Sequence, residues 1–110
     1  MSQDGSAISV RDAPDKGRYE IRLDEEVVGF TEYFDHDGHR VFLHTEVDPA
    51  YGGRGLAAQL VRSALDDVRE RGERIVNFCP YITTYLTKHD DWEDVIDRPT
   101  PEILERVRAR

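Results

Sequence analysis

The chain has 110 residues, of which 38% are hydrophobic and 35% charged, and its formal net charge is −8. This length suits one domain with a modest core. The negative charge disfavours nucleic acids and anionic membranes as partners and favours cationic ones, such as an amine or a basic protein tail. No stretch approaches the roughly 20 apolar residues that span a bilayer, and no signal-peptide pattern opens the chain. We therefore expect a cytoplasmic protein without nucleic-acid or membrane partners, either a monomer or a weak dimer.

The first half of the chain has the pattern of short strands joined by tight turns. The polar residues 1–6 are predicted to be disordered, and residues 7–110 to form a single domain. Apolar side chains mark four candidate strands, at residues 8–10, 19–23, 27–34 and 41–47. Turn-forming residues separate these strands, at 12–17, 24–26 and 35–39. Such short connections predict an antiparallel meander.

The third turn contains side-chain types that also bind metals, namely Asp35, His36, Asp37 and His39 around Gly38. Aspartate and glycine favour the backbone conformations of a hairpin turn, which explains this cluster more simply. The sequence therefore predicts no metal site.

Helical periodicity replaces the strand pattern in the second half of the chain. Apolar residues recur at three- and four-residue spacing and predict an amphipathic helix over 55–71, with Gly72 as its left-handed C-cap. The short apolar run 75–78 predicts a buried strand. Because the helix forms a crossover, this strand is expected to lie parallel to the strand 41–47.

Two more helices are expected toward the C-terminus, over 81–88 after Pro80 and over 100–110 after Pro99. The predicted fold class is therefore α/β (α+β). It consists of a mainly antiparallel sheet with one parallel crossover pair and helices packed on it.

The most distinctive segment is Tyr51-Gly52-Gly53-Arg54-Gly55-Leu56-Ala57, which enters the long helix. Its three glycines expose backbone N–H groups, and these amides and the helix dipole favour a bound phosphate. Arg54 adds a cation suited to phosphate. The segment is neither a P-loop, because no Gly-Lys-Ser/Thr follows, nor a dinucleotide fingerprint, because the third glycine is missing. A turn that merely starts the helix is the alternative interpretation.

The run Val47–Leu60, with the sequence VDPAYGGRGLAAQL, resembles the cofactor-binding motif of the GNAT superfamily of N-acetyltransferases. In that motif a strand and a Val-x-Pro lead-in precede [Gln/Arg]-x-x-Gly-x-[Gly/Ala]. Gly55 and Ala57 match its last two positions, whereas Gly52 stands where Gln or Arg is usual. Cys79-Pro80-Tyr81 and the later pair Lys88-His89 are similar to an abbreviated, single-domain GNAT-like subfamily that lacks the N-terminal helices.

The resemblance implies that the chain binds acetyl-CoA. Its pantetheine arm would lie between the strand ending at Val47 and the strand 75–78, which splay apart. Main-chain groups around Glu46 and Val47 would pair with the pantetheine amides, and the glycine loop would hold the pyrophosphate. The implied cofactor-binding residues are Glu46, Val47, Gly52, Gly53, Arg54, Gly55, Leu56, Ala57, Tyr85 and Lys88.

Acetyl transfer to an amine requires a base and an acid. Glu46 and His44 lie two residues apart on one strand and so face the same side of the sheet, and either can be the base. The alternative interpretation is that His44 is a hydrogen-bonded core residue and Glu46 a solvated carboxylate at the rim. For the acid, the resemblance implies a tyrosine in the helix after the second strand. Tyr85 is the nearest match, Leu86 can occupy the equivalent position, and Tyr81 is a second candidate.

Cys79, the single cysteine, cannot form an internal disulfide and ends the strand that would flank the acetyl group. Its thiol can accept the acetyl group or can be a small buried hydrophobe. We prefer direct attack by the acceptor. The expected function is transfer of acetyl from acetyl-CoA to an amine, such as a protein lysine or N-terminus. The alternatives are a non-catalytic acetyl-CoA/CoA-binding sensor and an interaction module without cofactor.

Overall fold

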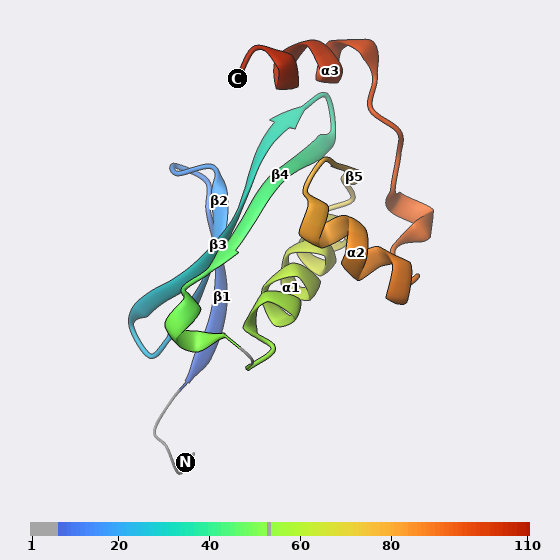
Figure 1. Cartoon of the computed structure of the whole chain (residues 1–110). Coiled ribbons are helices and arrows are strands. Elements are labelled where there is room, and N and C mark those ends of the chain that lie inside the picture. Colours follow the sequence, from blue (N-terminus) through green and yellow to red (C-terminus); the bar gives the residue numbers. More distant parts are fainter. Residues whose placement is uncertain (1–6, 53) are drawn as a thin grey trace.

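The computed structural model describes residues 7–52 and 54–110, so the segment 1–6 predicted to be disordered lies outside the described residues (Figure 1). Five strands form one sheet in the order β1-β2-β3-β4-β5. The first four pair antiparallel, and β5 pairs parallel with β4. The strands are β1 (Ile8–Ala13), β2 (Arg18–Leu23), β3 (Glu26–His36), β4 (His39–Val47) and β5 (Arg74–Asn77). This topology confirms the predicted fold class.

Asp37 and Gly38 alone form the turn between β3 and β4. Their φ angles are 52° and 82°, and a two-residue hairpin of this kind requires positive values at both positions. Strand pairing continues up to the facing residues His36 and His39. The cluster 35–39 is therefore a hairpin, as predicted, although the strands run closer to its tip than the sequence pattern indicated.

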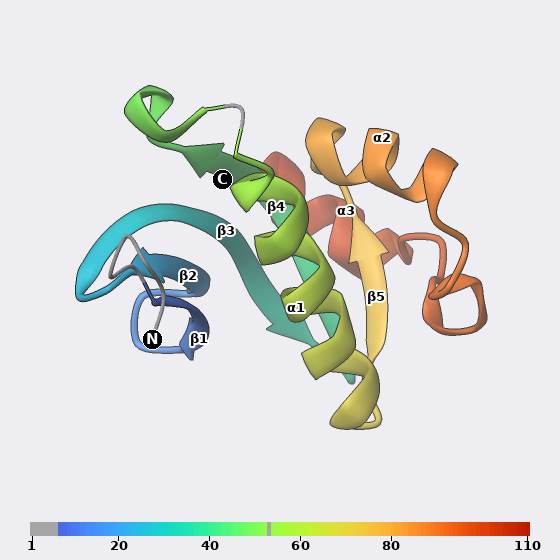
Figure 2. The ribbon, with the colours of Figure 1, turned by 90° about the horizontal axis from the view of Figure 1, so that it is seen from below.

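Helix α1 (Leu56–Glu70) packs across one face of the sheet and contacts all five strands (Figure 2). Its apolar stripe is buried at Leu56, Leu60, Val61, Ala64, Leu65 and Val68. Beyond its last turn, Gly72 has a φ of 73°, and the amide of Glu73 donates to the carbonyl of Val68 at 3.1 Å. This is the left-handed C-cap that glycine favours. The predicted helix 55–71 is confirmed to within one residue at each end.

Two shorter helices complete the fold. Helix α2 (Pro80–Lys88) follows β5, and helix α3 (Pro101–Arg108) begins at Thr100, whose hydroxyl accepts from the amide of Ile103 at 3.2 Å. Ile103 is fully buried against Phe34, Val41 and Val76, and α3 lies beside the tip of the β3–β4 hairpin (Figure 1). Two 3₁₀ turns also occur, η1 (Pro49–Tyr51) and η2 (Glu93–Val95).

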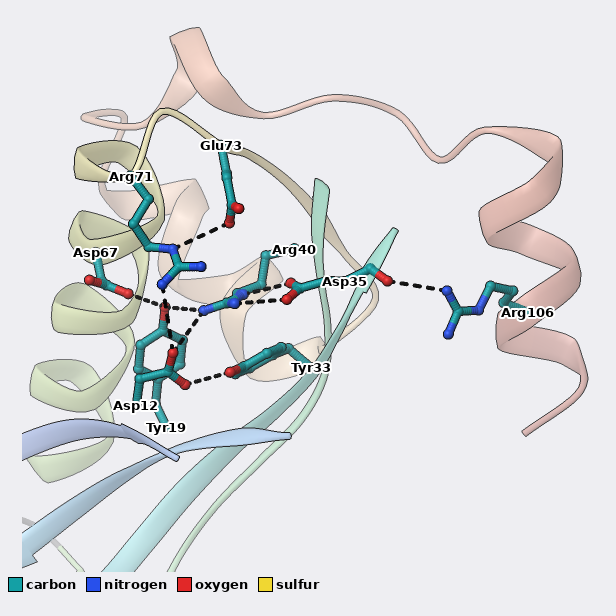
Figure 3. Close-up of polar contacts among 9 residues, drawn as sticks. All are labelled: Asp12, Tyr19, Tyr33, Asp35, Arg40, Asp67, Arg71, Glu73 and Arg106. Carbon is teal, nitrogen blue, oxygen red and sulfur yellow. Dashed lines mark hydrogen bonds and ion pairs between the residues drawn. The ribbon is translucent and has the colours of Figure 1, made fainter. Parts of the chain in front are cut away.

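A buried arginine joins four strands to helix α1 (Figure 3). Arg40 of β4 is 2% exposed and donates two hydrogen bonds to Asp35 of β3, at 2.7 and 2.8 Å. It also donates to Asp12 of β1 at 3.2 Å and to the hydroxyl of Tyr19 of β2 at 2.8 Å. Tyr19 in turn donates to Asp67 of α1 at 2.6 Å. Burial alone would lower the pKa of Arg40, but its hydrogen bonds to Asp35 and Tyr19 raise that pKa, so the charge persists.

Candidate functional site

A β-bulge in β4 decides which side chains face away from helix α1. Glu32 of β3 pairs with His44, whereas the next residue, Tyr33, pairs with Phe42, so Leu43 is an extra residue in β4. Phe42 lies in the core beneath α1. Strict alternation from Phe42 would direct His44 into the same core. The extra residue instead directs His44 to the opposite side of the sheet.

We call this side the open face, defined by the side chains of Arg18, Phe30, His44 and Glu46. The guanidinium of Arg18 lies 4.6 Å from the centre of the Phe30 ring, and the rings of Phe30 and His44 are 6.3 Å apart. His44 Nε2 lies 2.8 Å from Glu46 Oε2, and the two side chains are 50% and 61% exposed. They therefore form a hydrogen-bonded pair on one face, as their spacing predicted.

Strands β4 and β5 separate where β5 leaves the sheet, and we call the region between β4 and the start of α2 the cleft. Strand pairing ends at Phe42 and Asn77, and the amide of Phe78 makes one more bond, 2.8 Å long, to the carbonyl of Phe42. The side chain of Asn77 then accepts from the amide of Cys79 at 2.9 Å and donates to Thr83 at 3.0 Å. This turn directs the chain into α2 and away from β4. The two strands thus splay apart beyond Phe42, as predicted.

Cys79 lies on the wall of this cleft and is 1% exposed. Its Sγ is 3.2 Å from the hydroxyl of Thr45, which is 2.8 Å from the hydroxyl of the fully buried Thr31. The sequence singled out Cys79 but missed both threonines. Thr45 faces the same side of the sheet as Phe42 only because of the extra residue Leu43, and the sequence carries no sign of that bulge.

The glycine loop forms a pocket at the start of α1. Gly55 is the residue before the helix, with a left-handed φ of 73° and no side chain to occupy the helix N-terminus. Gly53, one of the predicted phosphate-binding residues, lies outside the described residues. The pocket has a volume of about 230 Å³. It is lined by Val47, Tyr51, Gly52, Gly55, Leu56, Ala57, Ala58 and Tyr81. The predicted Arg54 lies next to it, with its guanidinium 5.4 Å from the centre of the Tyr51 ring.

A second pocket, of about 240 Å³, extends the first between α1 and α2. It shares Ala58 and Tyr81 with the first pocket, so the two adjoin. Together we call them the cofactor groove, after the binding role that the sequence predicts for the glycine loop. Its remaining lining residues are Thr84, Tyr85, Lys88 and His89. The predicted residues Tyr85 and Lys88 thus lie on the same groove as the glycine loop.

The two candidate tyrosines have different surroundings. Tyr85 is 8% exposed and packs between His89 and Trp92, at ring distances of 4.3 and 5.8 Å. Tyr81 is 38% exposed and lines both parts of the cofactor groove. Burial raises the pKa of both phenols, and the nearby Cys79 thiol adds to the rise at Tyr81. Both therefore keep their proton at neutral pH, and Tyr81 is the one beside Cys79.

The described part of the chain lacks two other features, a metal site and a membrane-spanning helix. Within residues 7–52 and 54–110, no group of three or more His, Cys, Asp and Glu side chains is arranged to hold a metal ion. No helix of these segments is long and apolar enough to cross a membrane.

Comparisons with known proteins agree with this geometry. The family model described as GCN5-related N-acetyl-transferase matches residues 18–95. The mouse protein named Protein NATD1 is 32% identical over 111 residues, which cover 96% of this chain and 90% of that protein. Its human counterpart is 35% identical over 77 residues, covering 68% and 60%.

The fold has a parallel among solved structures. A GCN5-like protein from Staphylococcus aureus, determined by NMR, superimposes with a TM-score of 0.62 at 22% identity, covering 84% of this chain and 91% of that one. The family match spans most of the chain, including β4, the glycine loop, α1 and α2. The chain therefore belongs to the GCN5-related N-acetyltransferases, enzymes whose acyl donor is acetyl-CoA.

Proposed function

We propose that the protein transfers the acetyl group of acetyl-CoA to an amine acceptor by direct attack on the thioester. The observation that carries this proposal is the cofactor groove, which is lined by the glycine loop, by Val47 at the end of β4 and by Tyr81 of α2. A hydrogen-bonded histidine and carboxylate, His44 and Glu46, lie on the same strand. The glycine-loop part of the binding site and the proton acceptor are thus supplied by one continuous piece of chain, residues 44–58.

The cofactor is held at three places. The pyrophosphate binds the first turn of α1 and the glycine loop, through Gly52, Gly53, Arg54, Gly55, Leu56 and Ala57. Lys88, beside Tyr85 in the groove, binds a further phosphate of the cofactor. The main chain of Glu46 and Val47 pairs with pantetheine, which is supported by the free edge of β4 beyond the splay point.

His44 is the base, and Glu46 orients it. A neutral imidazole that donates from Nε2 to the carboxylate keeps Nδ1 as its proton acceptor, and the carboxylate stabilises the imidazolium that forms. His44 and Glu46, which the sequence analysis offered as alternative bases, thus have different roles in the same proton transfer.

Tyr81 donates the proton to the departing CoA thiolate, with Tyr85 as the second candidate. Exposure to the cofactor groove and proximity to Cys79 favour Tyr81. The burial of Cys79 and its contact with Thr45 favour direct attack over an acetyl-cysteine intermediate. Because no described helix lies over His44 and Glu46, which are half or more exposed, the acceptor can be as large as a protein.

The first test is calorimetric titration with acetyl-CoA, with ATP and NADH as decoys. Gly55→Glu fills the glycine loop and should abolish binding. Gly72→Glu is the matched control, because both glycines have a φ of +73° and open space around a Cβ. Gly72 lies at the other end of α1, so its variant should still bind. Loss in both variants, or no binding by the wild type, contradicts the proposal.

Turnover is tested by CoA release with a panel of amines. Release that depends on the amine establishes the transferase. Selective binding of acetyl-CoA without release from any amine would favour the non-catalytic sensor instead.

A further inference from the structure

A separate hollow lies where β3 begins and β4 ends. Its volume is about 440 Å³, and we call it the β3–β4 hollow, defined by Val27, Phe30, Val47 and Pro49 with the carboxylates of Glu46 and Asp48. Val47 also lines the cofactor groove. The two depressions therefore meet at Val47, and under the proposed function a molecule in the hollow would lie next to the bound cofactor.

The hollow combines an apolar lining with negative charge. Val27 is 36% exposed, which makes it one of the few large apolar side chains at the surface of the described residues. Glu46 is 61% exposed, and Asp48 is fixed because its carboxylate accepts from the amide of Ala50 at 2.9 Å. Two carboxylates at an apolar depression attract a cation that carries a hydrocarbon stem.

The one cation that the described residues place in the lining, Arg18, is held by an ion pair. Arg18 forms an ion pair of 2.8 Å with Glu20, whose side chain is 3% exposed, and it lies over the ring of Phe30. Burial alone would raise the pKa of Glu20, but the hydrogen bonds from Arg18 and Arg22 lower it, so this carboxylate stays ionised. The two carboxylates of Glu46 and Asp48 outnumber Arg18, so the lining keeps a net negative charge for a ligand.

We propose that the β3–β4 hollow binds the side chain of a lysine in a polypeptide acceptor. This inference rests on the proposed function. The four methylene groups of lysine match the apolar lining of Val27, Phe30 and Val47, and its ammonium group matches Glu46. A chain N-terminus has no such stem, and a small amine gains nothing from the exposed surface on either side.

The hollow places the ammonium next to the base. His44 is hydrogen-bonded to Glu46, so a lysine attracted by Glu46 reaches the imidazole. The lysine nitrogen forms a bond to the acetyl carbon while the carbon–sulfur bond breaks. Of the two protons that the ammonium loses, one passes through His44 to solvent and the other replaces the proton that Tyr81 gives to the CoA sulfur. The products are acetyl-lysine and CoA.

The test compares two exposed apolar positions, each changed to lysine. Val27→Lys puts a positive charge into the hollow, whereas Ile8→Lys puts one on β1, where the side chain is 44% exposed and lies outside the hollow. The substrate is a lysine peptide with a blocked N-terminus. In Val27→Lys we expect the KM for this peptide to rise about tenfold and the Kd for acetyl-CoA to stay unchanged. In Ile8→Lys both should stay at wild-type values.

An unchanged peptide KM in Val27→Lys would overturn the inference while leaving acetyl transfer intact. The inference would also be overturned, with acetyl transfer intact, if the wild type acetylated only peptides that have a free N-terminus. Binding is also measured without turnover, by following backbone amide signals while the blocked peptide is added. Shifts confined to the hollow, at Val27, Phe30 and Asp48, support the inference even if no amine is acetylated. No shift there at millimolar peptide overturns it.

Discussion

Gly29 lies at the closest approach of β3 to β4, in the wall of the β3–β4 hollow. A Cβ atom there would be 2.8 Å from the carbonyl oxygen of Glu46 and 2.9 Å from Cγ2 of Val47. Both distances are too short for non-bonded atoms, so any larger residue must push the end of β4 outward. That end carries the main-chain groups proposed to pair with pantetheine.

Gly29→Ala should therefore lower both stability and activity. We expect a loss of about 1–3 kcal/mol in the free energy of unfolding, from overpacking against rigid backbone. The measurement is urea denaturation, together with the Kd for acetyl-CoA. Gly52→Ala is the stability control, because its Cβ would lie 3.3 Å from one carbonyl oxygen and its φ is an ordinary −65°. Equal unfolding midpoints for the two variants would contradict the argument.

The two tyrosines of α2 can be separated by removing each hydroxyl. Tyr81→Phe should lower kcat about a hundredfold, the usual size of a general-acid contribution, with little change in the Kd for acetyl-CoA. Tyr85→Phe keeps its packing against His89 and Trp92 and should retain most of kcat. A larger loss of kcat in Tyr85→Phe than in Tyr81→Phe would instead identify Tyr85 as the acid. Because burial raises the pKa of Tyr81 above the ordinary value of a tyrosine, loss of activity through its deprotonation should have its midpoint at a higher pH than in an exposed tyrosine.

At the scale of elements, the segment after α2 returns to the free edge of β5. The amide of Asp97 donates to the carbonyl of Ile75 at 2.8 Å. Its carboxylate accepts two hydrogen bonds from Arg74, at 2.6 and 2.8 Å, and lies 2.9 Å from Nε2 of His39. Two side chains from the sheet thus hold the linker that leads to α3.

This attachment should weaken in acid. The hydrogen bonds from Arg74, and then that from His39, lower the pKa of Asp97 to about 2 from the usual 3.8. A carboxylate whose pKa is lower in the folded than in the unfolded chain stabilises the fold at pH values above its unfolded pKa. This stabilisation is lost as the pH falls from about 4 to about 2. Asp97→Asn should therefore show a smaller fall in unfolding free energy between pH 5 and pH 2.5. Asp90→Asn, in the same segment, should follow the wild type.

The elements that sequence alone predicted are those specified by local patterns. Helix α1 has one apolar stripe and a glycine at its end, so both of its boundaries could be predicted. The side on which His44 lies could not, because it depends on the bulge at Leu43, and only the pairing of β3 with β4 creates that bulge. The importance of Gly29 was missed for the same reason, since its close contact is with a distant strand.

The candidate site likewise has one part that local sequence predicted and another that depends on the fold. The glycine loop was found from its composition and its place before a helix. The choice between Tyr81 and Tyr85 requires knowing which side of α2 faces α1 and the cleft. Both side chains lie on a short helix with weak periodicity, so Tyr85 was favoured only through the resemblance to the family.

At the scale of the whole molecule, the Arg40 cluster joins β1 through β4 to α1 (Figure 3). Through the carbonyl of Asp35, it also reaches Arg106 of α3, at 3.1 Å. Parts of the chain that are far apart in sequence therefore meet at one buried charge.

Arg40→Met should cost roughly 3 kcal/mol in the free energy of unfolding, because it leaves partly buried carboxylates without their partner. The cluster lies outside the cofactor groove, so the Kd for acetyl-CoA of the folded variant should stay unchanged. Arg11→Met, at an exposed position on β1, is the control and should change stability by less than about 0.5 kcal/mol. An Arg40→Met protein as stable as the wild type would show that the cluster is dispensable.

The burial of the only thiol makes motion of the cleft measurable without any added label. A thiol-specific reagent can modify native Cys79 only during the intervals in which it leaves Thr45 and meets solvent. The ratio of its labelling rate to that of the unfolded chain gives the fraction of time spent open. Acetyl-CoA that fills the cleft should slow this labelling in proportion to its occupancy. One labelling rate therefore reports both the opening of the cleft and the fraction of protein that has acetyl-CoA bound.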